Sequence, residues 1–368
     1  MKTPPNLFNY ATSELSQDAF LLWLLDWANP DYKDADEQLN AAAQEFVRFL
    51  LDKNKNDLQI ESVKCYKQLK NIDVLAIVKI VNNVFAILIE DKTDTSEHDN
   101  QLTNYTQWFE NEGKKILNIE NKPELHCIYY KTGNESYYYL NKLEKKYKNN
   151  HSNVAFKILL RSDILNVLKE VFPSSLNPIF IDYVNHLQKI ENLTNSYQTE
   201  PAGEWKEEAW QGFYMELEKQ LEMGNWGADY YHKGFRLPLC PITIDEKQIQ
   251  LYLYIDKSRN LCIKAKCKAK CPPKKDYWDE IIKMIKGGLH EYLKSIDLRI
   301  YDISISDGND IKLCDIKRLK NNKRSMFIRK TLSFSAQQPD IVNQLKELQK
   351  QLSTVAEEIK KTSYIEIK

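Results

Sequence analysis

The sequence has little glycine and no long apolar run. Its 10 glycines among 368 residues form no glycine-rich segment, so we expect no phosphate-binding loop in the chain. The longest apolar runs, Phe20–Leu25 and Val84–Ile89, are far too short to cross a bilayer. The opening residues, Met1–Pro5, lack the apolar segment and the cleavage site of a secretory signal. These absences predict a cytoplasmic protein with no membrane partner.

A disulfide framework and a net charge are missing too. The seven cysteines are an odd number without framework spacing, as is typical of reduced thiols in a cytosol. The 52 lysines and arginines are balanced by 52 aspartates and glutamates. Net charge therefore gives no support to a nucleic-acid partner, which would need a local basic face. No Ser-His-Asp arrangement and no His-Glu-x-x-His helix is apparent, so neither of these hydrolase sites is expected.

Length and composition are those of a globular protein with two domains. Hydrophobic residues make up 42% of the chain and charged residues 28%, a balance typical of soluble globular proteins. A polar segment with proline and glycine, Asn192–Gly203, marks the expected boundary. We therefore expect one domain over residues 1–195 and a second over residues 203–368.

The first domain alternates helices with strands. A first helix is predicted to begin near Ser13 and to stop at Asn29-Pro30. Apolar spacing predicts further helices over residues 35–51 and 97–111, and strands over residues 72–81, 84–92, 125–131 and 156–160. This order predicts an α/β fold in which a mixed sheet is flanked by helices.

The second domain has an α+β pattern. Helices are predicted over residues 204–223 and 277–293, a hairpin over residues 248–255 and 260–269, and strands over residues 298–305 and 326–332. Near the C-terminus, apolar residues at alternating spacings of three and four predict an amphipathic helix: Leu345, Leu348, Leu352, Val355 and Ile359. This helix either packs back on the second domain or forms a homodimer through its apolar seam.

Charged residues stand at the ends of the two most apolar strands. If the turn between them is centred on Asn82-Asn83, Asp73 lies directly opposite Lys92, with the two side chains on one face roughly 5 Å apart. Glu90 shares that face and lies diagonally across from Asp73, roughly 7 Å away. The spacing therefore predicts that two carboxylates and one ammonium group converge.

This set of side chains suits the hydrolysis of a phosphodiester. Mg²⁺ accepts one or two protein carboxylates, here Asp73 and Glu90, and otherwise keeps water and phosphate oxygens as ligands. The Asp91 carbonyl could supply a further oxygen to the metal. Lys92 could orient or help deprotonate the attacking water, or offset charge on the phosphate.

The alternative is a surface hairpin with a cross-strand salt bridge, worth only ~0.5 kcal/mol. The almost continuous apolar sequence of both strands instead indicates burial on both faces. Charges at the ends of such strands are costly unless they are paired or bind a metal.

The segments Ile72-Asp73-Val74 and Ile89-Glu90-Asp91-Lys92, joined by a hairpin, resemble the PD-(D/E)XK nuclease superfamily. The leading proline of that motif is absent, because Asn71-Ile72 stands at its place. The resemblance implies a restriction-endonuclease-like fold in which Asp73 and Glu90 bind Mg²⁺, with Mn²⁺ as a substitute. It implies that Lys92 is the catalytic lysine.

Two further segments are similar to that superfamily, which extends the resemblance over residues 14–160. Glu14 lies on the first helix, where many members place a metal-binding glutamate. Gln101 and Tyr105 match the Gln-x-x-x-Tyr element of one large branch, where these residues help to place the nucleic acid and the active site. The two residues share a helical face. The alternatives are a core aromatic for Tyr105 and a solvated polar residue for Gln101.

A row of lysines in the second domain is the candidate basic face. Lysines alternate along the predicted strand at 260–269 and its extension and would share one side of it: Lys264, Lys266, Lys268 and Lys270. Such a row would bind a phosphate backbone in a salt-dependent way. The alternative is a charged face that protects an edge strand from pairing with another chain.

Together these patterns predict a divalent-metal-dependent nuclease that hydrolyses DNA. The resemblance favours a role in defence against foreign DNA such as that of phages. RNA remains open as a substrate, because nothing in the sequence reports recognition of a 2′-hydroxyl. The alternative function is a catalytically silent nuclease-fold module that binds nucleic acid or a protein partner.

Overall fold

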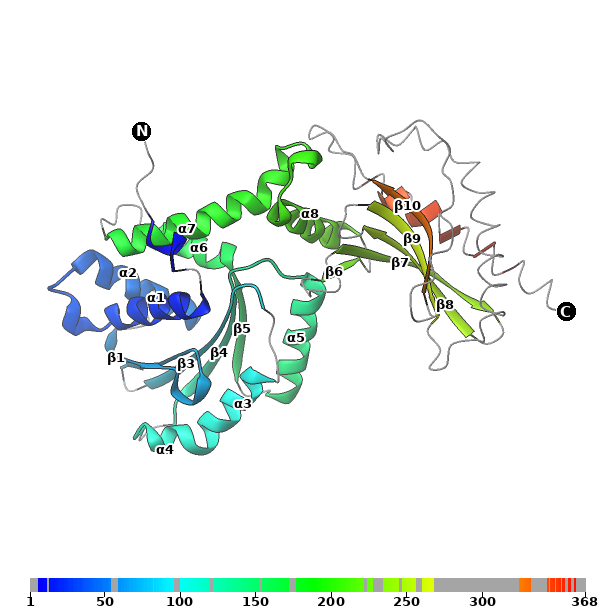
Figure 1. Cartoon of the computed structure of the whole chain (residues 1–368). Helices are drawn as coiled ribbons and strands as arrows, with labels where there is room; N and C mark the ends of the chain where they lie inside the picture. The colour runs from blue at the N-terminus through cyan, green and yellow to red at the C-terminus, as the bar shows by residue number, and fades with distance from the viewer. Residues whose placement is uncertain are drawn as a thin grey trace, which may run out of the picture. The chain divides into compact units, whose positions relative to one another are not determined.

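We describe the fold from a computed structural model of the chain. It describes residues 6–11, 13–53, 59–81, 83–95, 100–119, 122–151, 154–171, 177–221, 224–227, 234–244, 247–255, 260–267 and 324–331, together with scattered helical residues between 343 and 361. The chain divides into two compact units (Figure 1). The first comprises residues 1–135 and 139–193, and the second comprises residues 136–138 and 194–368.

The polar segment expected at the boundary is largely helical. Helix α7 (Pro178–Asn195) runs into it, and the short 3-10 helices Ser196–Gln198 and Ala202–Glu204 follow. Residues 136–138 belong to the second unit although they lie far from it in sequence. No sequence pattern predicts that these three residues belong to the second unit.

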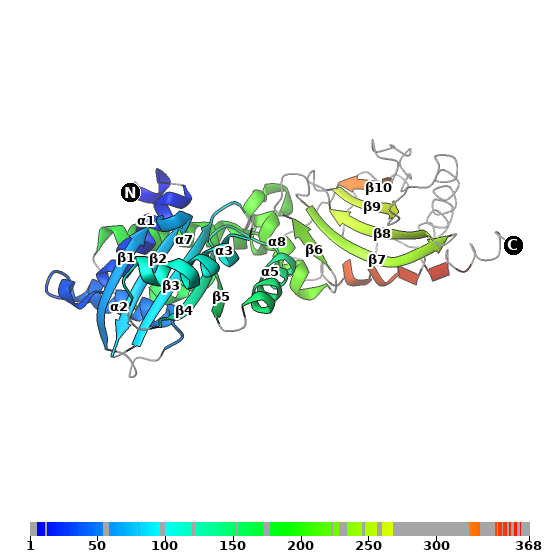
Figure 2. The same ribbon diagram turned by 90° about the horizontal axis from the view of Figure 1, so that it is seen from below.

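The first unit is built on a five-stranded mixed sheet with the strands in chain order (Figures 1 and 2). Strands β1, β2 and β3 pair antiparallel, whereas β3, β4 and β5 pair parallel. The strand bounds are Ile60–Lys67 for β1, Val74–Ile80 for β2, Asn83–Lys92 for β3, Glu124–Lys131 for β4 and Ala155–Leu160 for β5. The prediction of a mixed sheet flanked by helices is confirmed.

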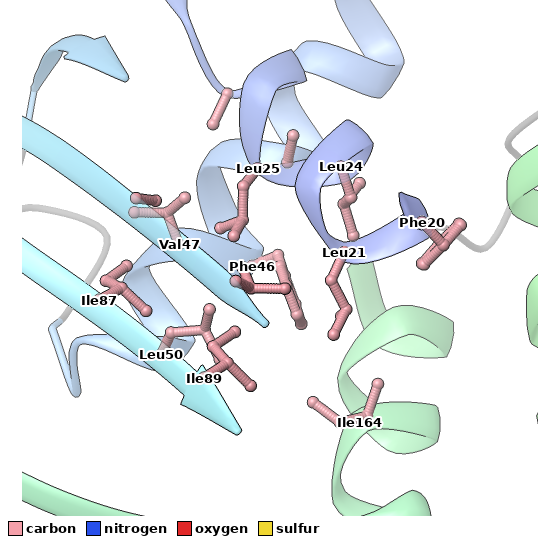
Figure 3. Packing of buried hydrophobic residues seen from close by; sticks show 14 of the residues in the cluster. Phe20, Leu21, Leu24, Leu25, Phe46, Val47, Leu50, Ile87, Ile89 and Ile164 are labelled. Carbon is pink, nitrogen blue, oxygen red and sulfur yellow. The ribbon is translucent and has the colours of Figure 1, made fainter. Parts of the chain in front are cut away.

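Helices cover both faces of this sheet (Figure 2). One face carries α1 (Glu14–Trp27), α2 (Glu37–Leu50) and α6 (Arg161–Val171), together with α7. Their apolar side chains meet those of the strands in one buried cluster. Figure 3 shows Leu21 and Leu25 of α1 and Phe46 of α2 directed toward Ile87 and Ile89 of β3. Because every second residue of β3 is used here, its other side chains face the opposite layer.

The opposite layer consists of α3 (Gln101–Trp108) and α5 (Tyr137–Asn150). Thr106 of α3, Cys127 of β4 and Tyr147 of α5 form a buried hydrogen-bonded group between these elements. The helix predicted over residues 97–111 is interrupted, because a π-helical turn at Phe109–Gly113 follows α3 and leads into the short α4 (Lys114–Ile116). Residues 96–99 lie outside the described residues.

The predicted register of the β2–β3 hairpin is wrong by two residues. Asn83 belongs to β3 and pairs with Ile80, so the turn lies between these two residues and is not centred on residues 82 and 83. Continuing the observed pairing of Val74 with Ile89 sets Asp73 opposite Glu90, not opposite Lys92. A slip of two residues leaves every side chain on its face, so the apolar pattern alone cannot tell the two registers apart.

The second unit combines helix α8 (Glu207–Gln220) with a five-stranded sheet in the order β10-β9-β8-β7-β6. All pairs in this sheet are antiparallel. The strand bounds are Asn225–Gly227 for β6, Gly234–Ile244 for β7, Lys247–Ile255 for β8, Asn260–Cys267 for β9 and Arg324–Thr331 for β10. The predicted hairpin at 248–269 is confirmed as β8 and β9.

Several predictions for the second unit concern residues outside the described ranges. The helix at 277–293 and the strand at 298–305 lie outside the described residues, as do Lys268 and Lys270. Of the C-terminal apolar seam, Leu345 is described, and it is buried beside Leu221, Phe235 and Leu253. At this position the helix packs back on its own unit. Leu348, Leu352, Val355 and Ile359 also lie outside the described residues.

None of the helices within the described ranges is both long and apolar enough to cross a membrane.

Candidate functional site

The predicted site residues of the first unit gather at one end of its sheet. Asp73 comes directly before β2, whereas Glu90, Asp91 and Lys92 are the last three residues of β3. Both Glu90 and Asp91 are 0% exposed, and Lys92 is 6% exposed. Charged groups buried to this degree are costly unless they are paired, so their partners define the site.

Glu90, Lys92 and Asp73 form its centre. The Lys92 Nζ makes an ion pair with the Glu90 Oε1. The Asp73 Oδ2 accepts a hydrogen bond of 3.0 Å from the Asp91 backbone N–H, which ties the start of β2 to the end of β3. This cross-strand arrangement follows from the observed register, which brings Asp73 beside Glu90.

Burial, together with the negative charge of neighbouring carboxylates, shifts the pKa values of these groups. Burial, and then the charge of Asp73, raise the pKa of Glu90 to about 7, against the opposing effect of Lys92. Burial also raises the pKa of Asp73. For Lys92, burial lowers the pKa, but the hydrogen bond and charge of Glu90 outweigh it and leave the pKa above its usual value. One ammonium therefore does not balance the carboxylates around it.

Helix α3 brings Gln101 and Tyr105 to the same place. The Tyr105 hydroxyl donates to the Asn71 carbonyl oxygen at 2.5 Å, and the Gln101 Nε2 lies 3.4 Å from that hydroxyl. Burial and the nearby charges of Glu90 and Asp73 raise the pKa of Tyr105. Tyr105 is thus a buried aromatic whose hydroxyl is also a polar neighbour of Glu90.

Glu14 reaches the site from the first turn of α1. Its Oε1 accepts hydrogen bonds from the Thr93 backbone N–H at 3.0 Å and from the Thr95 hydroxyl at 2.9 Å. Its charge also contributes to the raised pKa of Asp73. Glu14 therefore holds the segment that directly follows Lys92, while its carboxylate lies within electrostatic reach of the central acids.

The Asp91 side chain points to the face of the sheet that carries α1, away from Glu90 and Lys92. It accepts a hydrogen bond from the Gln17 Nε2 and lies beside Asp18, both on α1. Burial, followed by the charge of Asp18, raises the pKa of Asp91 well above its usual value, and burial with the charge of Asp73 raises the pKa of Asp18 to about 7. What Asp91 contributes to the central group in this structure is its backbone N–H, which binds Asp73.

Asp18 was not predicted from the sequence, although a signal for it exists. It lies three residues before Leu21 and seven before Leu25, on the apolar face of the helix. A carboxylate on such a face is expensive and points to a buried partner. The predicted helix therefore contained the information, but the partner, Asp91, comes from a strand whose position required the structure.

A second buried lysine stands next to Lys92. Lys131 pairs with Lys92 in the parallel ladder of β3 and β4, and it is 0% exposed. Its Nζ donates to the Thr95 carbonyl oxygen and forms an ion pair of 3.8 Å with Glu135, while burial lowers its pKa. Lys131 and Glu14 thus hold the same segment from two sides. Lys131 ends a predicted apolar strand as Lys92 does, which is the signal that could have identified it.

Close backbone packing completes this end of the sheet. A Cβ added at Gly133 would lie 2.0 Å from the Thr93 carbonyl oxygen, so only glycine allows the two segments to approach. The buried Arg161 donates to the Thr132 carbonyl oxygen, to the Asn134 Oδ1 at 3.0 Å and to Glu191 at 2.9 Å. The scaffold behind the charged residues is therefore densely bonded.

The donor set fits a hard divalent cation. Within the described part of the chain, no three His, Cys, Asp or Glu side chains are gathered as a preformed metal-binding group. Mg²⁺, however, needs only one or two protein carboxylates and keeps water for its other positions. Asp73 and Glu90 offer two carboxylates at the ends of neighbouring strands, where burial and then the charge of Asp73 raise the pKa of Glu90, and a cation would offset that charge.

Lys264 and Lys266 belong to β9 of the second unit and are not part of this group. No protein-family model, no curated protein and no solved structure matches the chain. The interpretation of the site consequently depends on its own residues and their geometry.

Proposed function

We propose that this protein is a divalent-metal-dependent nuclease of the PD-(D/E)XK type, which hydrolyses DNA phosphodiester bonds. The observation that carries the proposal is the convergence of residues from separate segments at one end of a mixed sheet: Glu14, Asp73, Glu90, Lys92, Gln101 and Tyr105. Stability does not explain this convergence, because several buried carboxylates with too few cations oppose folding. A restriction-endonuclease-like fold is part of the same proposal.

In this function, Asp73 and Glu90 would hold Mg²⁺ or Mn²⁺. The cation, when bound, acts as a Lewis acid on the phosphate and lowers the pKa of a bound water. Glu90 projects from a fully buried strand end, and Asp73 is fixed by the Asp91 N–H, so both carboxylates are held before a ligand arrives. Such preorganisation is what a site for charge stabilisation requires.

Lys92 supplies positive charge and N–H donors beside the metal-binding carboxylates. Its ion pair with Glu90 fixes the ammonium at the end of β3. From there it can orient the attacking water or offset the charge that develops on the phosphate. Tyr105 binds the Asn71 carbonyl oxygen and so steadies the backbone that precedes Asp73, while Gln101 in turn contacts Tyr105.

The proposed biological setting is defence against foreign DNA. Its support is the resemblance to nucleases that serve restriction and defence.

The test is cleavage of linear, circular and single-stranded DNA, with RNA alongside, in Mg²⁺ or Mn²⁺. Wild type should cut at least one substrate, chelation should stop it, and Lys92→Ala should lower the rate by about 10²–10⁴. Lys79→Ala is the matched control, because Lys79 is an exposed lysine on the neighbouring strand and should leave the rate unchanged. If wild type cuts none of these substrates, the proposal fails, and intact binding would then indicate a silent module.

A further inference from the structure

Strands β7 to β10 of the second unit have an unusual charge composition. Their sequences contain no aspartate or glutamate, whereas they contain seven lysines and arginines. The charge is also uneven along the whole chain. Residues 257–330 hold 20 lysines and arginines against 9 aspartates and glutamates, although the protein as a whole is neutral. Local positive charge is the usual mark of a surface for a polyanion.

The register of this sheet places cations and tyrosines on one face. Tyr252 of β8 pairs with Lys264 of β9, and in an antiparallel ladder paired residues share a face. Two positions along, Lys266 pairs with Arg324 of β10 and with Gln250 of β8. In the other direction Tyr254 pairs with Arg236 of β7. We call this set the basic-aromatic face: Arg236, Tyr252, Tyr254, Lys264, Lys266 and Arg324.

The other face of the same sheet is committed to the core. Leu251, Leu253 and Ile255 of β8 are buried, while Tyr252 and Tyr254 between them are partly exposed. Phe235 of β7 pairs with Ile255 and stacks on Tyr214 of α8. The alternation therefore separates an apolar face, which holds the unit together, from the basic-aromatic face.

Edge protection does not explain the lysines of β9. The alternative reading of Lys264 and Lys266 required β9 to be an edge strand, where charge prevents pairing with another chain. In the structure β9 lies between β8 and β10 and pairs with both. An interior strand has no free edge to protect, so its alternating lysines call for another role.

We propose that the basic-aromatic face binds single-stranded nucleic acid. Lysines and arginines on this face would contact phosphates, and Tyr252 and Tyr254, one strand repeat apart, would stack on successive bases. A duplex would hide the base faces from the tyrosines, which is why a single strand is favoured. The inference deepens the proposed nuclease function and rests on it for the choice of nucleic acid over other polyanions.

The need for such a face follows from the charge of the first unit. That unit holds 27 aspartates and glutamates against 22 lysines and arginines, with five of the acids clustered at or beside the candidate site. This excess of acids opposes the approach of a polyanion, and a bound cation would reduce it. The second unit, with 30 lysines and arginines against 25 acids, can supply the attraction that holds the substrate.

The test is fluorescence anisotropy of labelled 20-nucleotide DNA and RNA single strands, and of a DNA duplex, with full-length protein in EDTA over a series of salt concentrations. Lys264→Gln/Lys266→Gln should weaken single-strand binding about tenfold or more and reduce the salt slope by about 1.4. Tyr252→Leu/Tyr254→Leu should weaken it about tenfold or more without changing that slope. Comparing the DNA and RNA single strands shows whether the protein prefers deoxyribose or ribose.

Lys142→Gln/Lys145→Gln is the matched control, since both lysines are exposed on α5 of the first unit, and it should bind like wild type. Circular dichroism and thermal unfolding confirm that each variant is folded. Equal binding by wild type and both face variants would overturn the inference, as would tighter binding of the duplex than of either single strand.

Because the measurement is made in EDTA, it separates the two proposals. If wild type binds through this face but cuts no substrate, the binding inference stands and the proposed nuclease function is wrong. If wild type cuts DNA and the face variants bind and cut as well as wild type, the nuclease function stands and the binding inference is wrong.

Discussion

The two sheets of this protein handle charge in opposite ways. The first buries a few charged residues at one end, where Glu90 and Lys92 pair and Asp73 is held by a backbone N–H. The second has no acid in β7 to β10, and its registers place Arg236, Lys264, Lys266 and Arg324 on one face. Buried, mutually bonded charges are expensive and geometrically fixed, as a reaction centre requires. Dispersed cations attract a polyanion without fixing its geometry, as a binding surface requires.

The sharpest way to break this comparison is to separate rate from affinity. Asp73→Asn should lower the cleavage rate by about 10²–10⁴ while leaving single-strand binding in EDTA unchanged. Lys264→Gln/Lys266→Gln should do the opposite, with a higher KM and a single-turnover rate at saturation within about threefold of wild type. Single-turnover kinetics at excess protein measures both. If the two variants lose rate and affinity in the same proportion, the division of roles is wrong.

The effect of a glycine substitution on stability should depend on how closely the backbone packs at that glycine. In Gly133→Ala the new Cβ would meet the Thr93 carbonyl oxygen, so the segment after Lys92 must shift. We expect a loss of about 2–3 kcal/mol in the free energy of unfolding, together with slower cleavage. Gly203→Ala is the control, because nothing lies within 4 Å of its Cβ, and it should change stability by less than about 0.5 kcal/mol. Urea denaturation measures the free energy of unfolding of both variants. Equal losses in the two would contradict the role of close packing at Gly133.

A buried carboxyl in the second unit sharpens the comparison through pH. Glu218 of α8 accepts hydrogen bonds from the Ser136 hydroxyl and the Tyr137 and Trp226 N–H groups, yet burial raises its pKa to about 7. Because its folded pKa lies above its unfolded value, its contribution to stability is complete below about pH 4.5 and is lost as pH rises through 7.

Glu218→Gln should therefore unfold with a weaker pH dependence between about pH 4.5 and 7, the difference from wild type reaching about 3 kcal/mol. Chemical denaturation over this range measures the difference directly. Parallel curves for wild type and variant would mean that Glu218 does not bind its proton more tightly in the folded protein.

The smallest effect is expected at an exposed ion pair. Lys148 lies 2.7 Å from Glu144 on the solvent side of α5, with 59% of the lysine side chain exposed. Lys148→Ala should change the free energy of unfolding by less than about 0.5 kcal/mol. The matched buried case is Lys131→Ala, which removes the partner of Glu135 and of the Thr95 carbonyl and should cost about 2–3 kcal/mol. Equal costs would show that burial does not set the value of these pairs.

Periodicity predicted those parts of the fold in which it is strongest. The helix at α1, the apolar strands β2 to β4 and the hairpin β8–β9 follow directly from spacings of 3.6 and 2 residues. Strand β7 was missed for a physical reason. It contains Pro238 and Pro241, which cannot donate to a ladder, and the register shifts between these two residues to accommodate them.

For the candidate site, spacing predicted which residues share a face but not how they pair. Asp73, Glu90 and Lys92 remain on one face in either register, so their convergence was accessible from the sequence. For Asp18 and Lys131 the sequence shows a charged residue in an apolar segment but not its partner, and for Gly133 it shows neither, because each acts on a segment that is distant along the chain. Long-range contacts of this kind depend on how helices dock on the sheet, which a single sequence does not encode in any local pattern.

The central claim is that Asp73 and Glu90 hold a divalent cation, and thermal unfolding in the presence of Mn²⁺ tests it most directly. At a concentration of 100 times the Kd, a single bound ion should stabilise wild type by about 2.7 kcal/mol, whereas Glu90→Gln should gain little at the same concentration. Lys79→Ala should respond like wild type. No stabilisation of wild type by Mn²⁺ or Mg²⁺, or an equal stabilisation of Glu90→Gln, would contradict the claim.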